Sequence, residues 1–207
     1  MMKACGLRAR GKRRFKATTN SAHDLPVAPN LLARHFAVDA PNRVWTGNIT
    51  YIWTEKGWLY LAVVIDLFNQ QVVSFAMGRR MTRTLVMDAL RMAWVRRHPG
   101  PGLIFHSHRG SHYASNDFRK LLREFKMESS MSRKGDCWDN AVTKTLFGSL
   151  KVERLHGMRF GARRQAKDEV MDRITFYNHR RLHSTPGYTS PINFEQKLLA
   201  AQISLAA

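Results

Sequence analysis

The 207-residue sequence predicts one α/β domain in which a mixed five-stranded sheet is flanked by helices. Three observations support this prediction. The composition, 44% hydrophobic and 24% charged, is typical of a chain that buries a core. Apolar and β-branched residues have strand-like spacing over 44–77. After Thr82 the spacing of apolar residues becomes helical.

Three strands joined by short turns open the domain. They are expected over 44–53, 58–66 and 71–77, and Gly57 lies in the first turn. Because such short turns permit only antiparallel pairing, the three strands should form a meander. The nearly continuous apolar run over 58–66 indicates a central strand that is buried on both faces.

Helices and strands alternate in the next part of the chain. Thr82 can cap a helix that runs to about Arg97, and the Pro- and Gly-rich segment 98–102 ends it. A short strand over 103–106 should run parallel to an earlier strand, because a helix intervenes. Ser115 caps a second helix, whose apolar residues fall at i, i+3, i+4 and i+7. These residues are Phe118, Leu121, Leu122 and Phe125.

A fifth short strand and two helices complete the prediction. The strand is expected over 127–131, a loop follows at 133–136, and a helix runs from Asp139 to about Arg154. Ala166, Val170, Ile174 and Tyr177 mark a last long helix. The aromatic residues within strands and helices are expected in the core, namely Trp45, Trp58, Tyr60, Phe105 and Phe147.

The charge of the chain is strongly positive. Lys and Arg number 34 against 15 Asp and Glu, a formal net charge of +19 with pI near 10.9. The net charge is +6 over 1–40, +6 over 41–110 and +7 over 111–207, so the excess is not confined to one tail. An even spread indicates that the folded body itself faces a polyanion, and nucleic acid is the expected partner.

Two regions are distinguished by composition. Residues 1–40 are interpreted as a basic N-terminal arm and linker, disordered over 11–40, and residues 41–200 as the folded core. The chain has no apolar run long enough to span a membrane. Its two cysteines, Cys5 and Cys137, are too few for a disulfide scaffold and fit a reducing compartment. We therefore expect a cytoplasmic protein.

Seven sequence strings occur in a recognisable order over about 42–196. They are VWTGNITYI (44–52), GWLYLAVVIDLF (57–68), HSHRGSHY (106–113), SMSRKG (130–135), WDNA (138–141), FGSLK (147–151) and YNHRRLHS (177–184). Together they resemble bacterial insertion-sequence transposases of the two-frame, copy-out paste-in kind, which have a retroviral-integrase-like core. The resemblance implies a ribonuclease H-like fold and a role in DNA transposition and integration. It also implies a bacterial, nucleoid-associated protein. The first ten residues resemble the end of the family's upstream DNA-binding segment.

The resemblance also implies a catalytic triad of acidic residues, and all three are substituted. In the family, two Asp and one Glu hold two Mg²⁺ ions that drive phosphodiester transesterification. The matching positions are Asn48, His108 and Lys144. Asn48 offers a neutral oxygen, His108 is a poor ligand for a hard cation, and Lys144 repels one. We expect DNA binding without cleavage and no metal or other cofactor in this copy.

Other acidic residues are not expected to replace the triad. Asp66 ends a strand, Asp136 and Asp139 precede a helix, and Glu153 lies in an exposed last turn.

Basic residues near the predicted site are candidate DNA contacts. Arg109 follows the strand that leads to His108, and Arg133 and Lys134 lie in the loop before the third motif helix. Lys151 and Arg154 extend along that helix, and Arg180 and Arg181 belong to the last string. Each of these has an alternative interpretation as an ordinary solvated residue. Trp138 can pack in the core, which we favour, or stack on a base.

Two other functions stay open. One is a non-enzymatic DNA-binding or regulatory protein that forms homo-oligomers, or mixed multimers with active copies of the family. The other is a zinc-dependent hydrolase that uses His106, His108 and His112, because histidines at i and i+2 of a strand face the same side.

Overall fold

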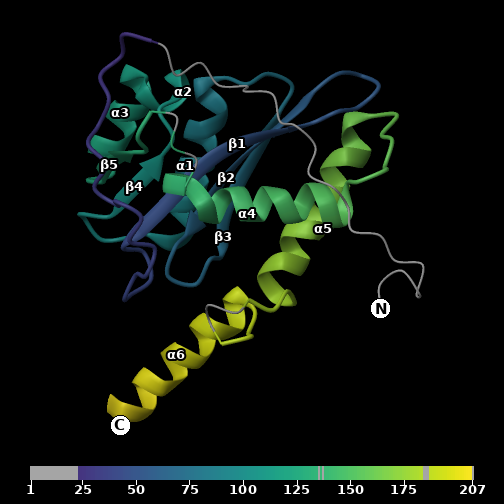
Figure 1. Ribbon diagram of the computed structural model, residues 1–207. Helices are drawn as coiled ribbons and strands as arrows, with labels where there is room; N and C mark the ends of the chain where they lie inside the picture. The colour runs from purple at the N-terminus through teal and green to yellow at the C-terminus, as the bar shows by residue number, and fades with distance from the viewer. Residues whose placement is uncertain (1–22, 135, 137, 184–186, 207) are drawn as a thin grey trace.

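The computed structural model describes residues 23–206, except 135, 137 and 184–186 (Figure 1). Its centre is a five-stranded sheet with the strand order β3-β2-β1-β4-β5. The strands are β1 (Val44–Ile52), β2 (Leu59–Asp66), β3 (Val72–Gly78), β4 (Ile104–Ser107) and β5 (Glu128–Met131). The predicted mixed sheet is confirmed, because β1, β2 and β3 pair antiparallel, β4 is parallel to β1, and β5 is parallel to β4.

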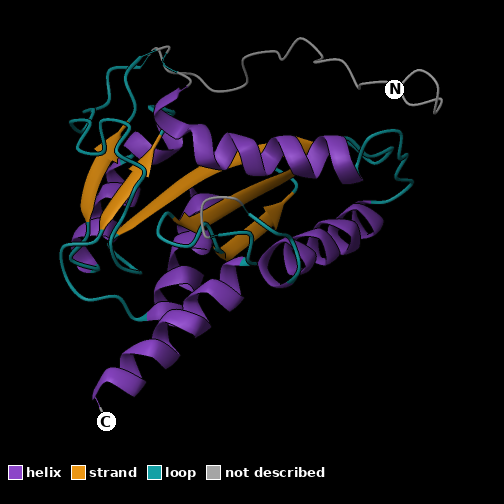
Figure 2. Cartoon of the chain, turned by 60° about the horizontal axis from the view of Figure 1, so that its bottom comes forward, coloured by secondary structure: helices purple, strands orange, loops and turns teal. Residues whose placement is uncertain are grey.

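Helices cover both faces of the sheet (Figures 1 and 2). The helices of the first face are α1 (Arg83–Arg97), α2 (Ser111–Ala114) and α3 (Asn116–Glu124). The helices of the second face are α4 (Ala141–Ser149) and α5 (Arg163–His179). A 3₁₀ turn, η1 (Trp138–Asn140), precedes α4, and a π-helical turn, η2 (Leu150–Arg154), continues it. The helix predicted from Asp139 to about Arg154 therefore exists, with irregular first and last turns.

The helix caps follow from the side chains at the helix starts. The Thr82 hydroxyl accepts a hydrogen bond from the Leu85 N–H, and the Ser115 hydroxyl accepts one from the Phe118 N–H. Both predicted caps are thereby confirmed. His98 adopts the left-handed conformation, and its N–H donates to the Trp94 carbonyl, which ends α1.

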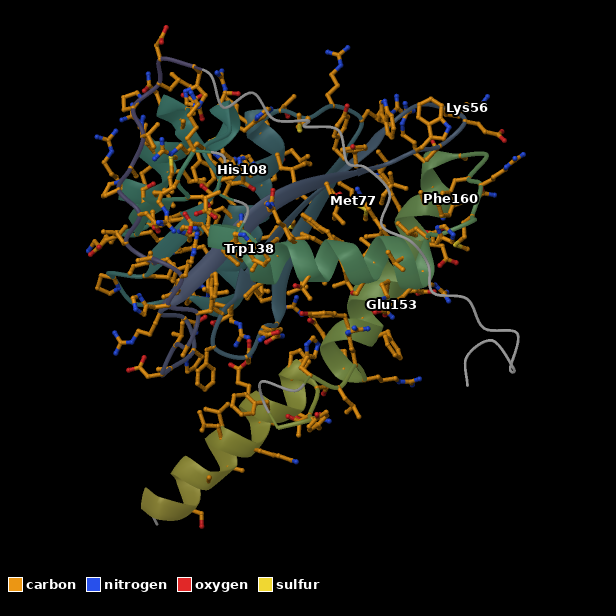
Figure 3. The ribbon with its side chains drawn as sticks, viewed as in Figure 1. Lys56, Met77, His108, Trp138, Glu153 and Phe160 are labelled. Atoms are coloured by element: carbon orange, nitrogen blue, oxygen red, sulfur yellow. The ribbon has the colours of Figure 1, made fainter. Side chains whose placement is uncertain are left out.

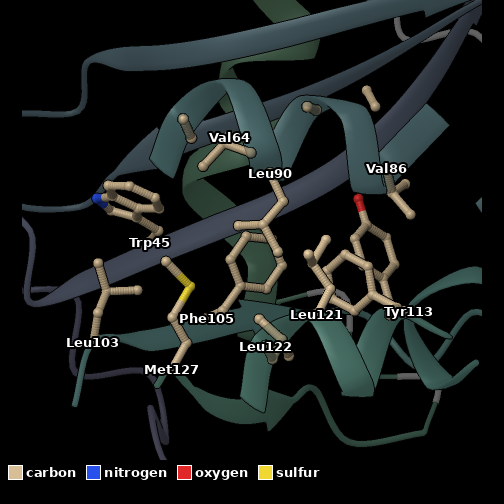
Figure 4. Close-up of a cluster of buried hydrophobic side chains, with 14 of the residues drawn as sticks. Trp45, Val64, Val86, Leu90, Leu103, Phe105, Tyr113, Leu121, Leu122 and Met127 are labelled. Carbon is tan, nitrogen blue, oxygen red and sulfur yellow. The ribbon is translucent and has the colours of Figure 1, made fainter. Parts of the chain in front are cut away.

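Strand β2 is buried on both faces, as the apolar run predicted. Ala62 and Val64 pack toward the first helical face, in a cluster with Trp45, Phe105 and Leu90 (Figure 4). Residues of the opposite parity pack against α4, η2 and α5. This second cluster includes Leu61, Val63, Ile65, Phe147, Leu150, Val170 and Ile174. The two clusters hold β1 and β4 rigidly between them, where the predicted site lies.

Two of the tryptophan predictions are wrong. Trp58 is 42% exposed, because β2 begins at Leu59 and Trp58 lies in the turn before it. Trp138 is 67% exposed, because η1 directs Asp139 and Asn140 inward and leaves the indole outside. Tyr60 is half-buried, whereas Trp45, Phe105 and Phe147 are buried as expected.

Residues 23–34, which we call the N-terminal strap, lie against the core. The Met131 N–H donates to the Pro29 carbonyl at 3.2 Å, and the Leu31 N–H donates to the Ser130 hydroxyl at 3.0 Å. Leu32 is buried. The expectation of disorder is thus wrong for the strap, whose backbone is fixed by hydrogen bonds. Residues 11–22 of that prediction lie outside the described residues.

A helix that the sequence analysis did not anticipate follows α5. This helix, α6 (Pro191–Ala206), extends away from the sheet (Figure 1). It is joined to the body by the Arg97 guanidinium, which donates to a carboxylate oxygen of Glu195 at 2.8 Å. In the described part of the chain, no helix is both long and apolar enough to cross a bilayer.

Candidate functional site

Asn48 and His108 lie side by side because their strands are neighbours. The parallel pairing of β1 with β4 places Gly47 opposite Ser107, and each candidate residue is the next one along its strand direction. Backbone pairing therefore fixes their separation independently of their side chains.

Helix α4 brings Lys144 to the same place. The Thr46 hydroxyl donates to the Asn140 side-chain oxygen at 2.9 Å and lies 3.1 Å from the Thr143 hydroxyl. Thr46 and Asn48 face the same side of β1, since successive strand residues alternate. Lys144 follows Thr143 and lies one turn after Asn140, so α4 sets it over the same side of the sheet. The three positions singled out by the sequence are therefore brought together.

The Asn48 side chain is almost fully buried, with 8% of its surface exposed. Its amide oxygen accepts a hydrogen bond from the Ile49 N–H at 2.8 Å. This contact uses one of the two lone pairs of an oxygen that is neutral, and a neutral oxygen attracts a hard cation less than a carboxylate does.

The His108 imidazole is held in one tautomer. Its Nδ1 accepts a hydrogen bond from the Gly110 N–H at 2.7 Å, so the neutral ring has its proton on Nε2. Nε2 is buried and has no hydrogen-bond partner within the described structure. Burial, together with the charges of His112 and Lys144, lowers the pKa of His108 to about 4. At neutral pH the site thus contains an uncharged imidazole whose Nε2–H has no hydrogen-bond partner among the described residues.

A divalent cation does not fit these residues. Mg²⁺ requires several oxygen ligands, usually carboxylates. Asn48 supplies one neutral oxygen, His108 has a proton on Nε2, and Lys144 has a positively charged ammonium group. The donor set is suited to an anion instead, because its free groups are N–H donors and a positive charge.

Neighbouring acidic residues are committed to structural contacts. Asp66 pairs with Trp45, three residues before Asn48 on β1, and its oxygens accept the Asn42 and Phe68 N–H groups. Burial raises the pKa of Asp66. Glu153 accepts hydrogen bonds from the guanidinium groups of Arg173 and Arg181.

Asp139 has more hydrogen-bond partners than its predicted position before a helix suggested. Its carboxylate is fully buried and accepts bonds from the Asn30 amide at 3.0 Å, from Arg34 Nε at 3.1 Å and from Arg133 Nη2 at 2.9 Å. The Arg133 backbone N–H adds a fourth donor at 2.8 Å. The hydrogen bonds from Arg133 contribute most to lowering the pKa of Asp139. Asp139 therefore ties the N-terminal strap to the start of α4.

The three histidines of the zinc alternative are not gathered into a metal site. His106 is fully buried, and its ring nitrogens lie 2.8 Å from the Ser130 hydroxyl and 3.2 Å from the Ser132 hydroxyl. His112 Nε2 is 2.7 Å from the Met81 carbonyl. Among the described residues, no group of three or more His, Cys, Asp or Glu side chains could hold a metal ion.

The candidate DNA contacts near the loop and the strand end have different environments. Arg109 is half-buried, and its Nε donates to the Ser132 carbonyl at 2.7 Å. Arg133 is bonded to Asp139, although half of its side chain is exposed. Lys134 is exposed in the turn.

The candidate DNA contacts on the helices also differ in their exposure and in whether they pair with a carboxylate. Lys151 lies 4.5 Å from the centre of the Tyr51 ring, and burial lowers the pKa of its ammonium group. Arg154 pairs with Glu169 at 2.6 Å, and Arg181 pairs with Glu153. Arg180 is exposed at the end of α5. Arg133, Arg154 and Arg181 are thus partly neutralised by carboxylates.

Comparison with known proteins identifies the family. A sequence model of the integrase core domain matches residues 38–137, and a second one matches residues 144–199. An insertion element IS600 uncharacterized 31 kDa protein of Shigella sonnei is 46% identical over 198 residues, which cover 95% of this chain and 73% of that protein. The transposase InsF for insertion sequence IS3A of Escherichia coli K12 is 45% identical over 196 residues, which cover 94% of this chain and 68% of InsF. The chain belongs to the IS3-type insertion-sequence transposases.

Solved retroviral integrases show the fold of this transposase family. The simian T-cell lymphotropic virus intasome in complex with PP2A regulatory subunit B56 gamma matches with a TM-score of 0.64 at 17% identity, over 84% of this chain and 59% of that chain. The catalytic core of HTLV-2 integrase in complex with magnesium matches with a TM-score of 0.56 at 15% identity, over 74% of this chain and 96% of the core. The ribonuclease H-like fold implied by the sequence is thereby confirmed.

Proposed function

We propose that this transposase-family protein binds DNA at the Asn48–His108–Lys144 site and does not cleave it. The observation that supports the proposal is the tautomer of His108, whose buried Nε2–H is a donor without a hydrogen-bond partner among the described residues. A metal ligand would need a lone pair at that atom, whereas a phosphate oxygen needs a proton there.

The three side chains are suited to holding one phosphate group. The Lys144 ammonium supplies the charge, His108 Nε2–H supplies a directed hydrogen bond, and the Asn48 amide N–H₂ supplies further donors. The backbone fixes two of these side chains, through Ile49 and Gly110, so little ordering entropy is lost on binding. Each phosphate contact is independent of base sequence and weakens with salt.

The remaining basic residues extend this site into a DNA-binding surface. Lys134 and Arg180 are exposed, and Arg109 lies one residue from His108. Arg133, Lys151, Arg154 and Arg181 complete the set, and DNA phosphates would compete with their present carboxylate partners where these exist. On this proposal the protein acts on chromosomal DNA in the nucleoid, as a homo-oligomer or in mixed multimers with active copies.

The test measures binding and cleavage separately on a duplex that carries transposon terminal repeats. The purified wild-type chain should bind the duplex and leave both strands intact in Mg²⁺ or Mn²⁺. The triple variant Asn48→Asp, His108→Asp, Lys144→Glu restores three carboxylates at one place and should gain metal-dependent cleavage. Metal-dependent cleavage by the wild-type chain would overturn the proposal.

Salt dependence tests the phosphate contact itself. Lys144→Gln should reduce the slope of log affinity against log salt by about 1, because one phosphate contact is lost. Lys120→Gln is the matched control, since Lys120 is an exposed lysine on α3, on the opposite face of the sheet. Equal slopes for the two variants would place the phosphate elsewhere.

A further inference from the structure

The turn between β1 and β2 has three aromatic side chains in contact with one another, which we call the aromatic tip (Tyr51, Trp53 and Trp58). The Trp53 and Trp58 rings are 4.8 Å apart and the Tyr51 and Trp58 rings are 4.9 Å apart, both with edge-to-face geometry. Trp53 is 58% exposed and Trp58 is 42% exposed. Two large indoles on one turn leave an apolar surface that the fold itself does not need to expose.

The turn that bears the aromatic tip is fixed to the body. Its Thr54 side chain is fully buried and donates a hydrogen bond to the Gly57 carbonyl at 2.6 Å. The Glu55 N–H donates to the Phe160 carbonyl at 2.9 Å, and Arg163 Nε donates to the Trp58 carbonyl at 3.1 Å. Figure 3 shows Lys56 and Phe160 together at this end of the molecule. The indoles are therefore presented by a rigid support.

Positive charge surrounds the aromatic tip. Lys151 lies over the Tyr51 ring at 4.5 Å, Lys56 is in the turn itself, and Arg163 bonds its backbone. The acidic residue of the turn is Glu55, so cations outnumber it. A hydrophobic protein partner would be poorly matched to these cations, whereas a polyanion with flat apolar rings would match both features.

The aromatic tip lies beyond the phosphate site along the direction of β1, with Tyr51 on the opposite side of that strand from Asn48, because strand residues alternate. Trp53 directly follows the end of β1 and is five residues after Asn48, a distance of about 16 Å at strand rise. Lys151 is seven residues after Lys144, about 10 Å along the helix. Both elements run toward the same end of the sheet (Figures 1 and 2). A strand with a phosphate at the site would therefore reach the tip within about five stacked nucleotides.

We propose that the aromatic tip stacks unpaired bases of a DNA end whose phosphate is held at the Asn48–His108–Lys144 site. The proposal rests on the proposed DNA binding and adds a preference for single-stranded overhangs. Bases inside a duplex have both faces covered by neighbours, so Trp53 and Trp58 can stack on bases within a strand only where those bases are unpaired. Lys56 and Lys151 then neutralise the adjoining phosphates.

The experiment compares one duplex in blunt form and with a five-nucleotide single-stranded overhang, using the full chain. The overhang should tighten binding by about tenfold or more, because stacking of even one base has that effect. Trp53→Ala with Trp58→Ala should abolish the gain and leave blunt-duplex affinity unchanged. Trp53→Phe with Trp58→Phe should retain much of the affinity that the overhang adds. Tyr188→Ala, which removes an exposed aromatic ring beyond α5, is the matched control.

A 2-aminopurine base in the overhang reports stacking directly. Its fluorescence should be quenched by the wild-type chain and not by the double alanine variant. Blunt-duplex binding without an overhang gain would overturn this inference and leave the proposed function standing, whereas loss of all DNA binding would overturn both. A double alanine variant that keeps the overhang gain but becomes monomeric would assign the tip to a second copy of the chain and overturn the inference.

Discussion

Acid should destabilise the protein partly through His108. The unfolded imidazole has an ordinary pKa near 6.5, whereas burial lowers the folded pKa of His108 to about 4. Between these values the unfolded chain binds a proton that the folded chain does not, so the free energy of unfolding falls as the pH is lowered through this window. At about 1.4 kcal/mol for each pH unit, the loss reaches at most about 3 kcal/mol by pH 4.

The variant His108→Asn isolates this contribution. Asparagine does not titrate, and its side-chain oxygen can accept the Gly110 N–H that Nδ1 accepts now. Urea unfolding at pH 7, 6, 5 and 4.5 should show the variant gaining about 2–3 kcal/mol relative to the wild type as the pH falls. Burial also lowers the pKa of His106 and His183. Both residues are present in the wild type and in the variant, so their contributions cancel in the difference between the two free energies of unfolding. A difference that stays constant with pH would refute the assignment.

Two further substitutions, each with a matched control substitution, test the packing around the site. Asp139→Asn should lower the free energy of unfolding by about 2–4 kcal/mol at pH 7, because two guanidinium groups lose a buried carboxylate, whereas Asp117→Asn in the exposed pair with Arg83 should change it by less than about 1 kcal/mol. Gly47→Ala should cost about 1–3 kcal/mol, since its Cβ would lie 2.5 Å from the Phe105 ring. Gly148→Ala, with open space around the new methyl group, should stabilise α4 by about 0.5–1 kcal/mol. Denaturant midpoints measure all four, and a neutral Asp139→Asn or Gly47→Ala would contradict the contacts described.

The sheet could be predicted because the spacing of apolar residues within each strand shows which of its faces are buried. Strand β2 reads as one apolar run since both of its faces are covered, and the change to helical spacing after Thr82 marks α1 directly. The prediction for Trp58 was wrong because the run of apolar residues begins at Trp58, whereas the pairing of β2 with β1 begins one residue later, at Leu59. A signal for α6 existed, since Ser190 accepts the Asn193 N–H and Pro191 occupies the first helical position.

The sequence predicts which three residues come together at the candidate site, but not the hydrogen bonds that orient them. The positions of Asn48, His108 and Lys144 followed from the family strings, and strand pairing explains why they meet. The tautomer of His108 depends on its hydrogen bond with the backbone N–H of Gly110, and a backbone contact of this kind cannot be predicted from residue types. Asp139 was undervalued for a similar reason, because two of its partners, Asn30 and Arg34, lie more than 100 residues away along the chain.

The N-terminal strap has a consequence for where the structural unit begins. Strand β5 is the outermost strand on its side of the sheet, and the strap borders its free edge. The Pro29 carbonyl accepts the Met131 N–H of that edge, and the Leu31 N–H donates to the Ser130 hydroxyl. An uncovered edge of this kind is a template for pairing with the strands of other molecules. The integrase-core match begins at residue 38, after the strap. A fragment cut at that sequence boundary would expose the edge of β5 and be prone to aggregation. The strap therefore protects the protein from edge-to-edge pairing with other molecules.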